Sequence, residues 1–314
     1  MASLSSRPRK RRVSGVSQWE LAWRRLKMNK AALAGLVIVG VIGVMALLDR
    51  LIALYPPNCN VGTNPNCPNP GPKPDVWAIG IPPSWSFPFG TNLAGQDVYS
   101  QIVYGARAAF LVGIGATAIA LAIATLIGLV AGYFGGWVDN VLMRLTEVVL
   151  VLPFFLILLV FLRILFTLSP GASGGLLVII LVIGAFSWPG PARIIRGEVL
   201  RVREFEYVAA SRQIGASGFR ILFRHLFPNT LHIIIVLSTL QIAGSILTEA
   251  AVSFLGFGDP NSITWGRQLA DASEAVKQAW WAGLAPGIFI TLLVMGFNLL
   301  GNGLRDALDP RLRE

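Results

Sequence analysis

The sequence predicts an all-α, polytopic membrane protein with six transmembrane helices and a structured cytoplasmic loop. Only 13% of its 314 residues are charged and 54% are hydrophobic, whereas charged residues make up about 25% of soluble domains. The hydrophobic residues form separate runs of about twenty, the length that crosses a bilayer. Lysines and arginines gather at the ends of these runs, so the net charge of +10 favours cytoplasmic loops over a nucleic-acid-binding face.

Residues 1–30 form a basic cytoplasmic arm with nine lysines and arginines. Trp19 and Trp23 lie one helical turn apart with basic residues behind them, which predicts a short helix in contact with lipid at the membrane surface. We expect the first span over residues 31–54. It is longer than the apolar core of a signal peptide, and no small-residue cleavage site follows it, so we predict a retained anchor.

Residues 55–105 form the predicted extracytoplasmic loop, which is rich in proline, asparagine and glycine. This loop holds Cys59 and Cys67, the only cysteines of the chain. A disulfide between them would be stable on the oxidising side of a membrane. The alternative is two free thiols, since a metal site needs more ligands than two cysteines supply.

Residues 106–314 are expected to hold the other five spans. The second span contains Gly113 and Gly115, which would let a neighbouring helix approach closely. In the third span, Arg144 and Glu147 have the i,i+3 spacing of an ion pair. The predicted boundaries of spans two to six are 108–132, 141–162, 175–188, 231–255 and 284–300.

Glu249 is an ionisable residue within the fifth span, and such residues are functional candidates by default. Because it lies near the predicted outer end, we expect that it either lines the extracytoplasmic mouth or pairs structurally with a neighbouring subunit. The residues that contact a transported solute stay unassigned.

Residues 192–228 interrupt the apolar pattern between the fourth and fifth spans and hold seven arginines. Residues 204–214 are good or neutral helix formers, and Gly215 then allows a turn. Residues 219–227 predict a second short helix that ends at Pro228. A folded element between two spans is typical of a docking site, so we expect it to bind a cytoplasmic partner.

The distribution of basic residues predicts the orientation. Residues 1–30, 192–227 and 301–314 hold nine, seven and three lysines and arginines, and all three segments lie on the same side of a six-span chain. Because cytoplasmic loops carry the excess of positive charge, both termini and the docking element are expected in the cytoplasm.

The sequence contains no pattern that predicts catalysis. No lysine stands in the glycine-rich P-loop pattern that binds nucleotide phosphates, and no Gly-x-Ser-x-Gly elbow occurs. His225 and His232, the only histidines, have no carboxylate or thiol spaced beside them for a metal. We therefore expect a chain without enzymatic activity, metal or cofactor of its own.

Several blocks of the sequence are similar to one family. The segment from Glu206 to Asn229, with YVAASRQIGAS and RHLFPN, resembles the EAA loop of bacterial ABC importer permeases, in the form of the C-type subunit of the dipeptide/oligopeptide subfamily. FGTNLAGQDVYSQIVYGAR, TEAAVSFLGFG and FNLLGNGLRDALDPRL fit the same subfamily. The sequence departs from the pattern at Ala209, where the family has its name-giving Glu. It also has Asn92 and Asn302 where acids are expected, which would weaken a local salt bridge.

The resemblance implies a permease subunit of the bacterial or archaeal plasma membrane that forms half of a pathway for peptides or a similar solute. Its implied partners are a homologous second permease subunit, two cytoplasmic ATPases that use ATP and Mg²⁺, and an extracytoplasmic solute-binding protein. Small residues would let the docking helix enter a groove on an ATPase, and arginines around it would reach the rim. The residues implied in ATPase coupling are Glu206, Tyr207, Ala209, Ala210, Ser211, Gly215, Arg224 and Pro228.

Two other classes of protein stay open at this point. A secondary transporter or channel would act without an ATPase, although such proteins usually carry inverted repeats and broken helices with buried charges, which we do not find here. A membrane scaffold would form no pathway at all. Within the importer class, nickel complexes and oligosaccharides are alternative solutes, because the binding protein largely sets the specificity.

Overall fold

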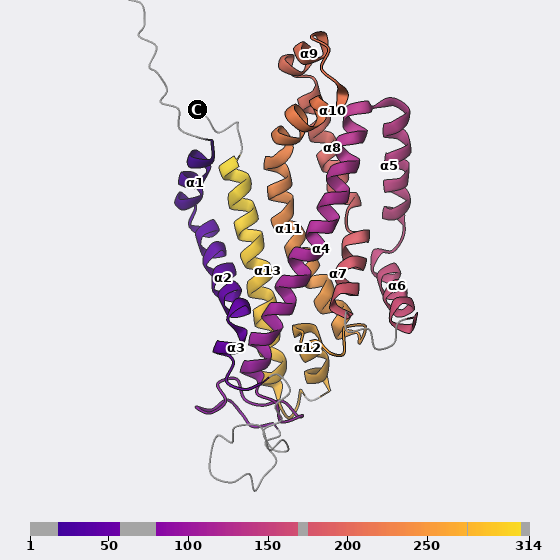
Figure 1. Cartoon of the computed structure of the whole chain (residues 1–314). Coiled ribbons are helices and arrows are strands. Elements are labelled where there is room, and N and C mark those ends of the chain that lie inside the picture. The colour runs from indigo at the N-terminus through magenta and orange to yellow at the C-terminus, as the bar shows by residue number, and fades with distance from the viewer. Residues whose placement is uncertain (1–17, 57–79, 169–174, 275, 309–314) are drawn as a thin grey trace, which may run out of the picture.

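The computed structural model describes residues 18–56, 80–168, 175–274 and 276–308, and in these ranges it is built of helices without a β-sheet (Figure 1). Cys59 and Cys67 lie outside the described residues, so their disulfide stays a prediction. The elements are α1 (Gln18–Met28), α2 (Lys30–Leu47), α3 (Asp49–Ile52), α4 (Val98–Phe134), α5 (Gly136–Val151), α6 (Phe154–Leu168), α7 (Gly175–Phe186), α8 (Pro189–Arg203), α9 (Glu206–Gln213), α10 (Gly218–Ile221), the π-helical segment η1 (Leu222–Leu226), α11 (Phe227–Phe254), α12 (Trp265–Ser273) and α13 (Trp280–Leu308).

Within the described ranges, four helices are long and apolar enough to cross a membrane, and two bent pairs bring the candidate spans to six if each pair counts as one. The four are α2, α4, α13 and the continuous helix that α10, η1 and α11 form together. The bent pairs are α5 with α6 and α7 with α8. These six candidates correspond in order to the six predicted spans, and the prediction of an all-α membrane protein is confirmed.

The predicted third span is not one straight helix. Helices α5 and α6 meet at 83° on either side of Leu152 and Pro153. Leu152 has φ −70° and ψ 135°, because the ring of a following proline disfavours helical backbone at the preceding residue. The third span predicted over residues 141–162 therefore corresponds to a bent pair of helices. The predicted ion pair within it is confirmed, since Arg144 Nη1 lies 2.9 Å from Glu147 Oε2.

The fourth span ends close to its predicted position, but the chain stays helical beyond it. Helix α7 bends by 44° into α8, whose first turn contains Pro189 and Pro191. Proline is tolerated in a first turn because the N–H groups there have no acceptor within the helix. Residues 192–203 of the predicted loop are thus a helical extension of the span.

The second helix of the predicted loop does not end at Pro228. Instead, α10 continues through η1 into α11, which has Pro228 in its first turn. A proline inside a regular helix lacks an N–H donor and clashes with the carbonyl four residues earlier. The π-helical turn of η1 changes this hydrogen-bond register, and the side chain of Asn229 donates to the carbonyl of His225 at 2.6 Å. The predicted helix end is wrong for this reason.

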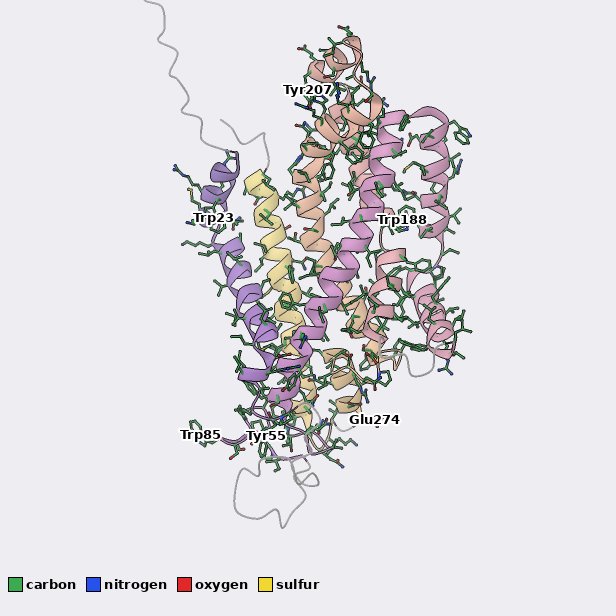
Figure 2. All side chains as sticks on the ribbon, viewed as in Figure 1. Trp23, Tyr55, Trp85, Trp188, Tyr207 and Glu274 are labelled. Atoms are coloured by element: carbon green, nitrogen blue, oxygen red, sulfur yellow. The ribbon has the colours of Figure 1, made fainter. Side chains whose placement is uncertain are left out.

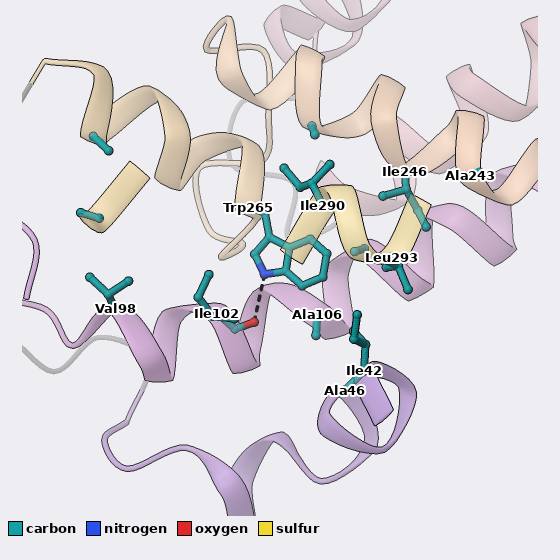
Figure 3. Packing of buried hydrophobic residues seen from close by; sticks show 14 of the residues in the cluster. Ile42, Ala46, Val98, Ile102, Ala106, Ala243, Ile246, Trp265, Ile290 and Leu293 are labelled. Carbon is teal, nitrogen blue, oxygen red and sulfur yellow. Dashed lines mark hydrogen bonds between the residues drawn. The ribbon is translucent and has the colours of Figure 1, made fainter. Parts of the chain in front are cut away.

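Helix α4 packs against α2, α7, α8 and α11 and so occupies the centre of the fold. A Cβ added at Gly113 would lie 2.8 Å from Ile246 of α11, and one at Gly115 would lie 3.0 Å from Ile180 of α7. The prediction that these glycines lie at close helix contacts is confirmed. At the start of α4, Trp265 of α12 is 1% exposed and its Nε1 donates to the carbonyl of Ile102 at 3.0 Å (Figure 3).

The described segments gather at two ends of the bundle. Figure 1 shows α1, α9, α10 and the C-terminal end of α13 at one end, and α3 and α12 at the other. The described parts of the three basic segments, residues 1–30, 192–227 and 301–314, thus lie at the same end of the bundle. The predicted orientation needs all three on one side of the membrane. Which side faces the cytoplasm stays a prediction, as does the position of α1 at the membrane surface.

Candidate functional site

Helix α9 and the turn after it project beyond the other helices of their end (Figures 1 and 2). We call the exposed part of residues 205–223 the docking surface. Its apolar side chains are open to solvent: Tyr207 is 40% exposed, Ile214 85% and Phe219 71%. Ala209 and Ala210 are exposed as well. Apolar side chains that gather on one projection mark an interaction site.

The opposite face of α9 packs against its own chain. Val208 is fully buried, and Ser211, one turn further, is 9% exposed. The Oγ of Ser211 donates to the carbonyl of Tyr207 at 2.7 Å and lies 3.4 Å from His225 Nε2. Because residues spaced i,i+3 share one face of a helix, Ser211 follows Val208 inward. The expectation that Ser211 enters a groove on a partner is therefore corrected, since this side chain fixes α9 to η1.

Two polar side chains in the first turn of α9 face outward. Glu206 is exposed in the first turn, where the helix dipole favours a carboxylate. Burial raises the pKa of the Tyr207 phenol, and the positive charge of Arg201 partly offsets this effect. The Tyr207 hydroxyl therefore stays protonated and can donate a hydrogen bond to a partner.

Gly215 makes the turn after α9 for a reason of backbone geometry. Its φ is +78°, a conformation that strains residues with a side chain. A Cβ at this position would meet nothing within 4 Å, so space is not the constraint. The N–H of Gly215 donates to the carbonyl of Arg212 at 3.0 Å. The glycine thus sets the path of the chain from Ile214 to Phe219.

Several arginines of the loop bind their own chain instead of facing a partner. Arg196 forms a two-point ion pair with Asp139 of α5. Arg203 donates to the carbonyls of Gly132 and Tyr133 at 2.9 and 3.3 Å. The expectation that the arginines reach a partner's rim is wrong for these two. Among the described residues, the exposed arginines of the loop that form no ion pair are Arg212, Arg220 and Arg224.

The docking surface is connected to the long helices on both of its sides. On one side, α8 packs closely on α4: a Cβ added at Gly128 would lie 2.8 Å from Ile195, and one at Gly132 would lie 2.7 Å from Val199. On the other side, η1 continues into α11. Pro228 is exposed at this junction, where it belongs to the continuous helix and lies beyond the docking surface.

Helix α11 leaves one face open along the bundle. Gln241, Gly244 and Thr248, spaced i,i+3,i+7, line a groove of about 330 Å³ beside α5 and α8. A second groove of about 320 Å³ runs between α11 and α13 and contains Thr291 and Asn298. Small and polar side chains on an open face of a membrane-spanning helix are suited to a solute pathway or to the close approach of another helix.

Glu249 belongs to neither groove. It is 2% exposed and accepts a hydrogen bond of 2.6 Å from the hydroxyl of Ser253, with a further hydrogen bond to Thr264. Both expectations for this residue, the extracytoplasmic mouth and a neighbouring subunit, are therefore wrong. Glu249 ties the end of α11 to the start of α12, a contact across 15 residues that spacing along one helix does not reveal.

Asn92, one of the departures from the acidic pattern, closes its own turn. Its Oδ1 accepts from the N–H groups of Ala94 and Gln96 at 3.0 and 2.8 Å, and its Nδ2 donates to Gln96 Oε1 at 3.0 Å. An ionised aspartate could not make the last of these bonds. Asn302, the other departure, is exposed beside the groove between α11 and α13.

One histidine lies near a carboxylate in the structure, although the two residues are far apart in the sequence. His232 Nε2 lies 3.5 Å from Glu198 of α8. In the part of the chain that the structure describes, no group of three His, Cys, Asp or Glu side chains is placed to hold a metal ion.

Two segments of the chain match known families. Residues 124–314 match the family described as binding-protein-dependent transport system inner membrane component. Residues 17–70 match the N-terminal TM domain of oligopeptide transport permease C.

Curated proteins are similar over nearly the whole chain. The dipeptide transport system permease protein of Bacillus subtilis is 40% identical, with 93% of this chain and 85% of that protein covered. The oligopeptide transport system permease protein of the same organism is 34% identical, with 95% and 92% covered. A glutathione transport system permease protein of Pectobacterium atrosepticum is 32% identical, with 99% and 97% covered.

Proposed function

Because the chain belongs to the family of binding-protein-dependent transport system inner membrane components, we propose that it is a permease subunit of a peptide importer and forms half of the pathway for di- or oligopeptides. In this proposal, the open face of α11 lines the pathway. The amide of Gln241 and the hydroxyl of Thr248 on α11, with Thr291 and Asn298 on the facing side of α13, can exchange hydrogen bonds with peptide groups. The other half is supplied by a homologous permease subunit.

The chain performs no ATP hydrolysis of its own in this proposal. Two cytoplasmic ATPases supply the energy, and an extracytoplasmic binding protein delivers the peptide. The docking surface lies on the cytoplasmic side, together with both termini. Its exposed Ala209 and Ala210 let α9 enter a groove of the ATPase, with Tyr207 and Ile214 as flanking contacts.

The observation that carries this proposal is the exposed apolar surface on α9, which is held between two long helices. A movement of the ATPase is transmitted through α8 to α4 and through η1 to α11 as a displacement of whole helices. A secondary transporter or channel would need no such surface, and a scaffold would need no open polar face within the spans.

The first test is peptide uptake by proteoliposomes that hold both permease subunits, the ATPases and the binding protein. Gly215→Val forces a branched side chain into a backbone with φ +78° and displaces the docking surface. We expect normal membrane insertion and at least about a tenfold loss of uptake, equivalent to about 1.4 kcal/mol.

The matched control is Gly197→Ala on α8, where an added Cβ also meets nothing within 4 Å. It should leave uptake unchanged. Full uptake by the Gly215→Val variant, or uptake by the permease subunits without an ATPase, would contradict the proposal. Competition by unlabelled dipeptide, with no competition by nickel complexes or oligosaccharides, would identify the class of solute.

A further inference from the structure

A cavity of about 790 Å³ lies at the end of the bundle opposite to the docking surface. Helix α3, residues 53–56 and helix α4 form most of it, and the start of α7 and residues 261–263 close its other side. Its polar lining includes Asp49, Arg50, Tyr104 and Arg107. None of these residues belongs to the grooves along α11.

The charged groups of this cavity leave one positive charge in excess. Asp49 is 5% exposed, and its Oδ2 accepts from Arg107 Nη1 at 3.2 Å, while the side chain of Arg107 is 54% exposed. A guanidinium has five N–H donors, so Arg107 keeps donors for a second anion. Arg50 is exposed, and the described part of the chain gives it no ion-pair partner. Two guanidinium groups and one carboxylate therefore suit a ligand with a single negative charge.

The cavity faces away from the open face of α11. Tyr104, Arg107 and Leu111 are spaced i,i+3,i+7 and lie on one face of α4. Gly113, two residues beyond Leu111 and about 200° around the helix, packs against α11. A ligand in the cavity is thus separated from α11 by the thickness of α4. The site is open to the membrane or to solvent and not to the proposed pathway.

An apolar strip leads from Arg107 along the same side of α4. Leu111 is 49% exposed, Ile114 52% and Leu126 58%, and the exposed Ala118 and Ala122 lie between them. The strip runs about 28 Å from Arg107 to Leu126 at the rise of an α-helix, close to the thickness of about 30 Å of the hydrocarbon core of a bilayer. The small side chains of the two alanines leave room at the centre of the strip, where an acyl chain could lie against the helix.

We propose that this cavity binds a membrane phospholipid. Arg50 and Arg107 hold its phosphodiester, and an acyl chain lies along the strip from Leu111 to Leu126. A phosphodiester carries one negative charge, and its oxygens match the fork of a guanidinium. Asp49 orients Arg107 toward the phosphate. Tyr104 lies at headgroup depth, where tyrosine is common in membrane proteins.

Native mass spectrometry of the assembled transporter tests the proposal with phosphatidylglycerol as the probe. The sample is purified in mild detergent, stripped of lipid and titrated with phosphatidylglycerol. We expect Arg50→Gln with Arg107→Gln to weaken binding at least tenfold. Arg50→Gln alone should weaken it less, and it leaves the fold intact because Arg50 has no ion pair to lose within the described residues. The matched control, Arg163→Gln on the exposed surface of α6, should bind as the original protein does.

Competition separates the sources of the anion. Inorganic phosphate and a dipeptide should leave bound phosphatidylglycerol in place, because neither fills the apolar strip. Equal phosphatidylglycerol binding by the original protein and both Arg50 variants would overturn the proposal. Displacement by inorganic phosphate would show a soluble-anion site, and displacement by the dipeptide a substrate site; either result would overturn it. The measurement needs no transport, so its result is independent of the proposed function.

Discussion

Asp139 and Arg196 join α5 to α8 through two parallel hydrogen bonds. The side chains are 13% and 31% exposed, so water screens this pair only partly. Replacing Asp139 by asparagine leaves the guanidinium without its charge partner in a half-buried position. We expect Asp139→Asn to lower the free energy of unfolding by about 1–3 kcal/mol, measured by denaturation of the purified protein in detergent.

Arg144 and Glu147 provide the control for this prediction. Their ion pair joins two residues of one helix and lies on the surface, with side chains 83% and 46% exposed. Exposed ion pairs contribute about 0–1 kcal/mol. Arg144→Gln should therefore lower the free energy of unfolding by less than Asp139→Asn does. A larger loss for Arg144→Gln would show that the Asp139–Arg196 pair does not stabilise the contact between α5 and α8.

Asp97 gives the stability a dependence on pH. It caps α4 by accepting hydrogen bonds from the N–H and Oγ of Ser100 at 2.8 and 2.6 Å, while its Oδ1 is buried without a partner among the described residues. Burial raises the pKa of this carboxyl, and the bonds from Ser100 partly oppose the shift. A raised pKa means that the stabilising contribution is present at low pH and is lost as the pH rises through the folded-state value.

The pH prediction is a comparison of the original protein with Asp97→Asn. The melting temperature of the original protein, relative to that of the variant, should be highest below the ordinary aspartate pKa of about 3.9 and should fall as the pH rises toward neutral. Thermal denaturation at a series of pH values measures this difference. A difference that stays constant, or that grows in favour of the original protein as the pH rises, would contradict the assignment.

At the scale of elements, the seam between α4 and α8 depends on two glycines. A side chain at Gly132 would enter the space of Val199 at 2.7 Å. We expect Gly132→Val to destabilise the fold by about 1–3 kcal/mol through overpacking and to lower uptake, because the docking surface loses its fixed connection to α4. Denaturation and proteoliposome uptake measure the two effects.

Gly197 again supplies the comparison, because it lies on α8 away from that seam. Alanine favours a helix interior over glycine by about 1 kcal/mol, so Gly197→Ala should keep or raise the stability. If Gly132→Val also kept the stability and uptake of the original protein, α4 and α8 would not pack tightly at Gly132.

The elements also show which parts of the structure a sequence can predict. Apolar length identified the six candidate spans, and the glycines at 113 and 115 correctly marked close helix contacts. Proline was the less reliable signal. Pro153 bends a span that hydropathy shows as continuous, and Pro228 fails to end a helix because η1 changes the hydrogen-bond register before it.

The sequence predicted where the candidate site lies in the chain. It did not predict which of its side chains point outward and which pack against the protein. The composition of residues 192–228 indicated a docking element, and Gly215 indicated its turn. The inward position of Ser211 and the binding of Arg203 to carbonyls of α4 depend on contacts between segments far apart in sequence. Glu249 was misplaced for the same reason, since Thr264 comes from beyond the end of its helix.

At the scale of the whole molecule, the docking surface, the seam on α4 and the open face of α11 form one connected path. The grooves proposed to contact the peptide lie at one end of this path, and the proposed ATPase contact lies at the other. The lipid site proposed on α4 faces away from α11, and its apolar strip runs on the face of α4 that leads to the seam with α8.

Site-directed cross-linking in the complete transporter tests whether α9 contacts an ATPase subunit. With Cys59 and Cys67 replaced by serine, a single cysteine is placed at Ala210, on the exposed side of α9, or at Arg305 on α13 as a control at the same end. We expect Ala210→Cys to cross-link to an ATPase subunit with a yield that changes on addition of ATP, and Arg305→Cys to cross-link only weakly. An ATPase adduct from Arg305→Cys but none from Ala210→Cys would contradict this expectation, as would labelling of Ala210→Cys by a membrane-impermeant reagent from outside intact cells.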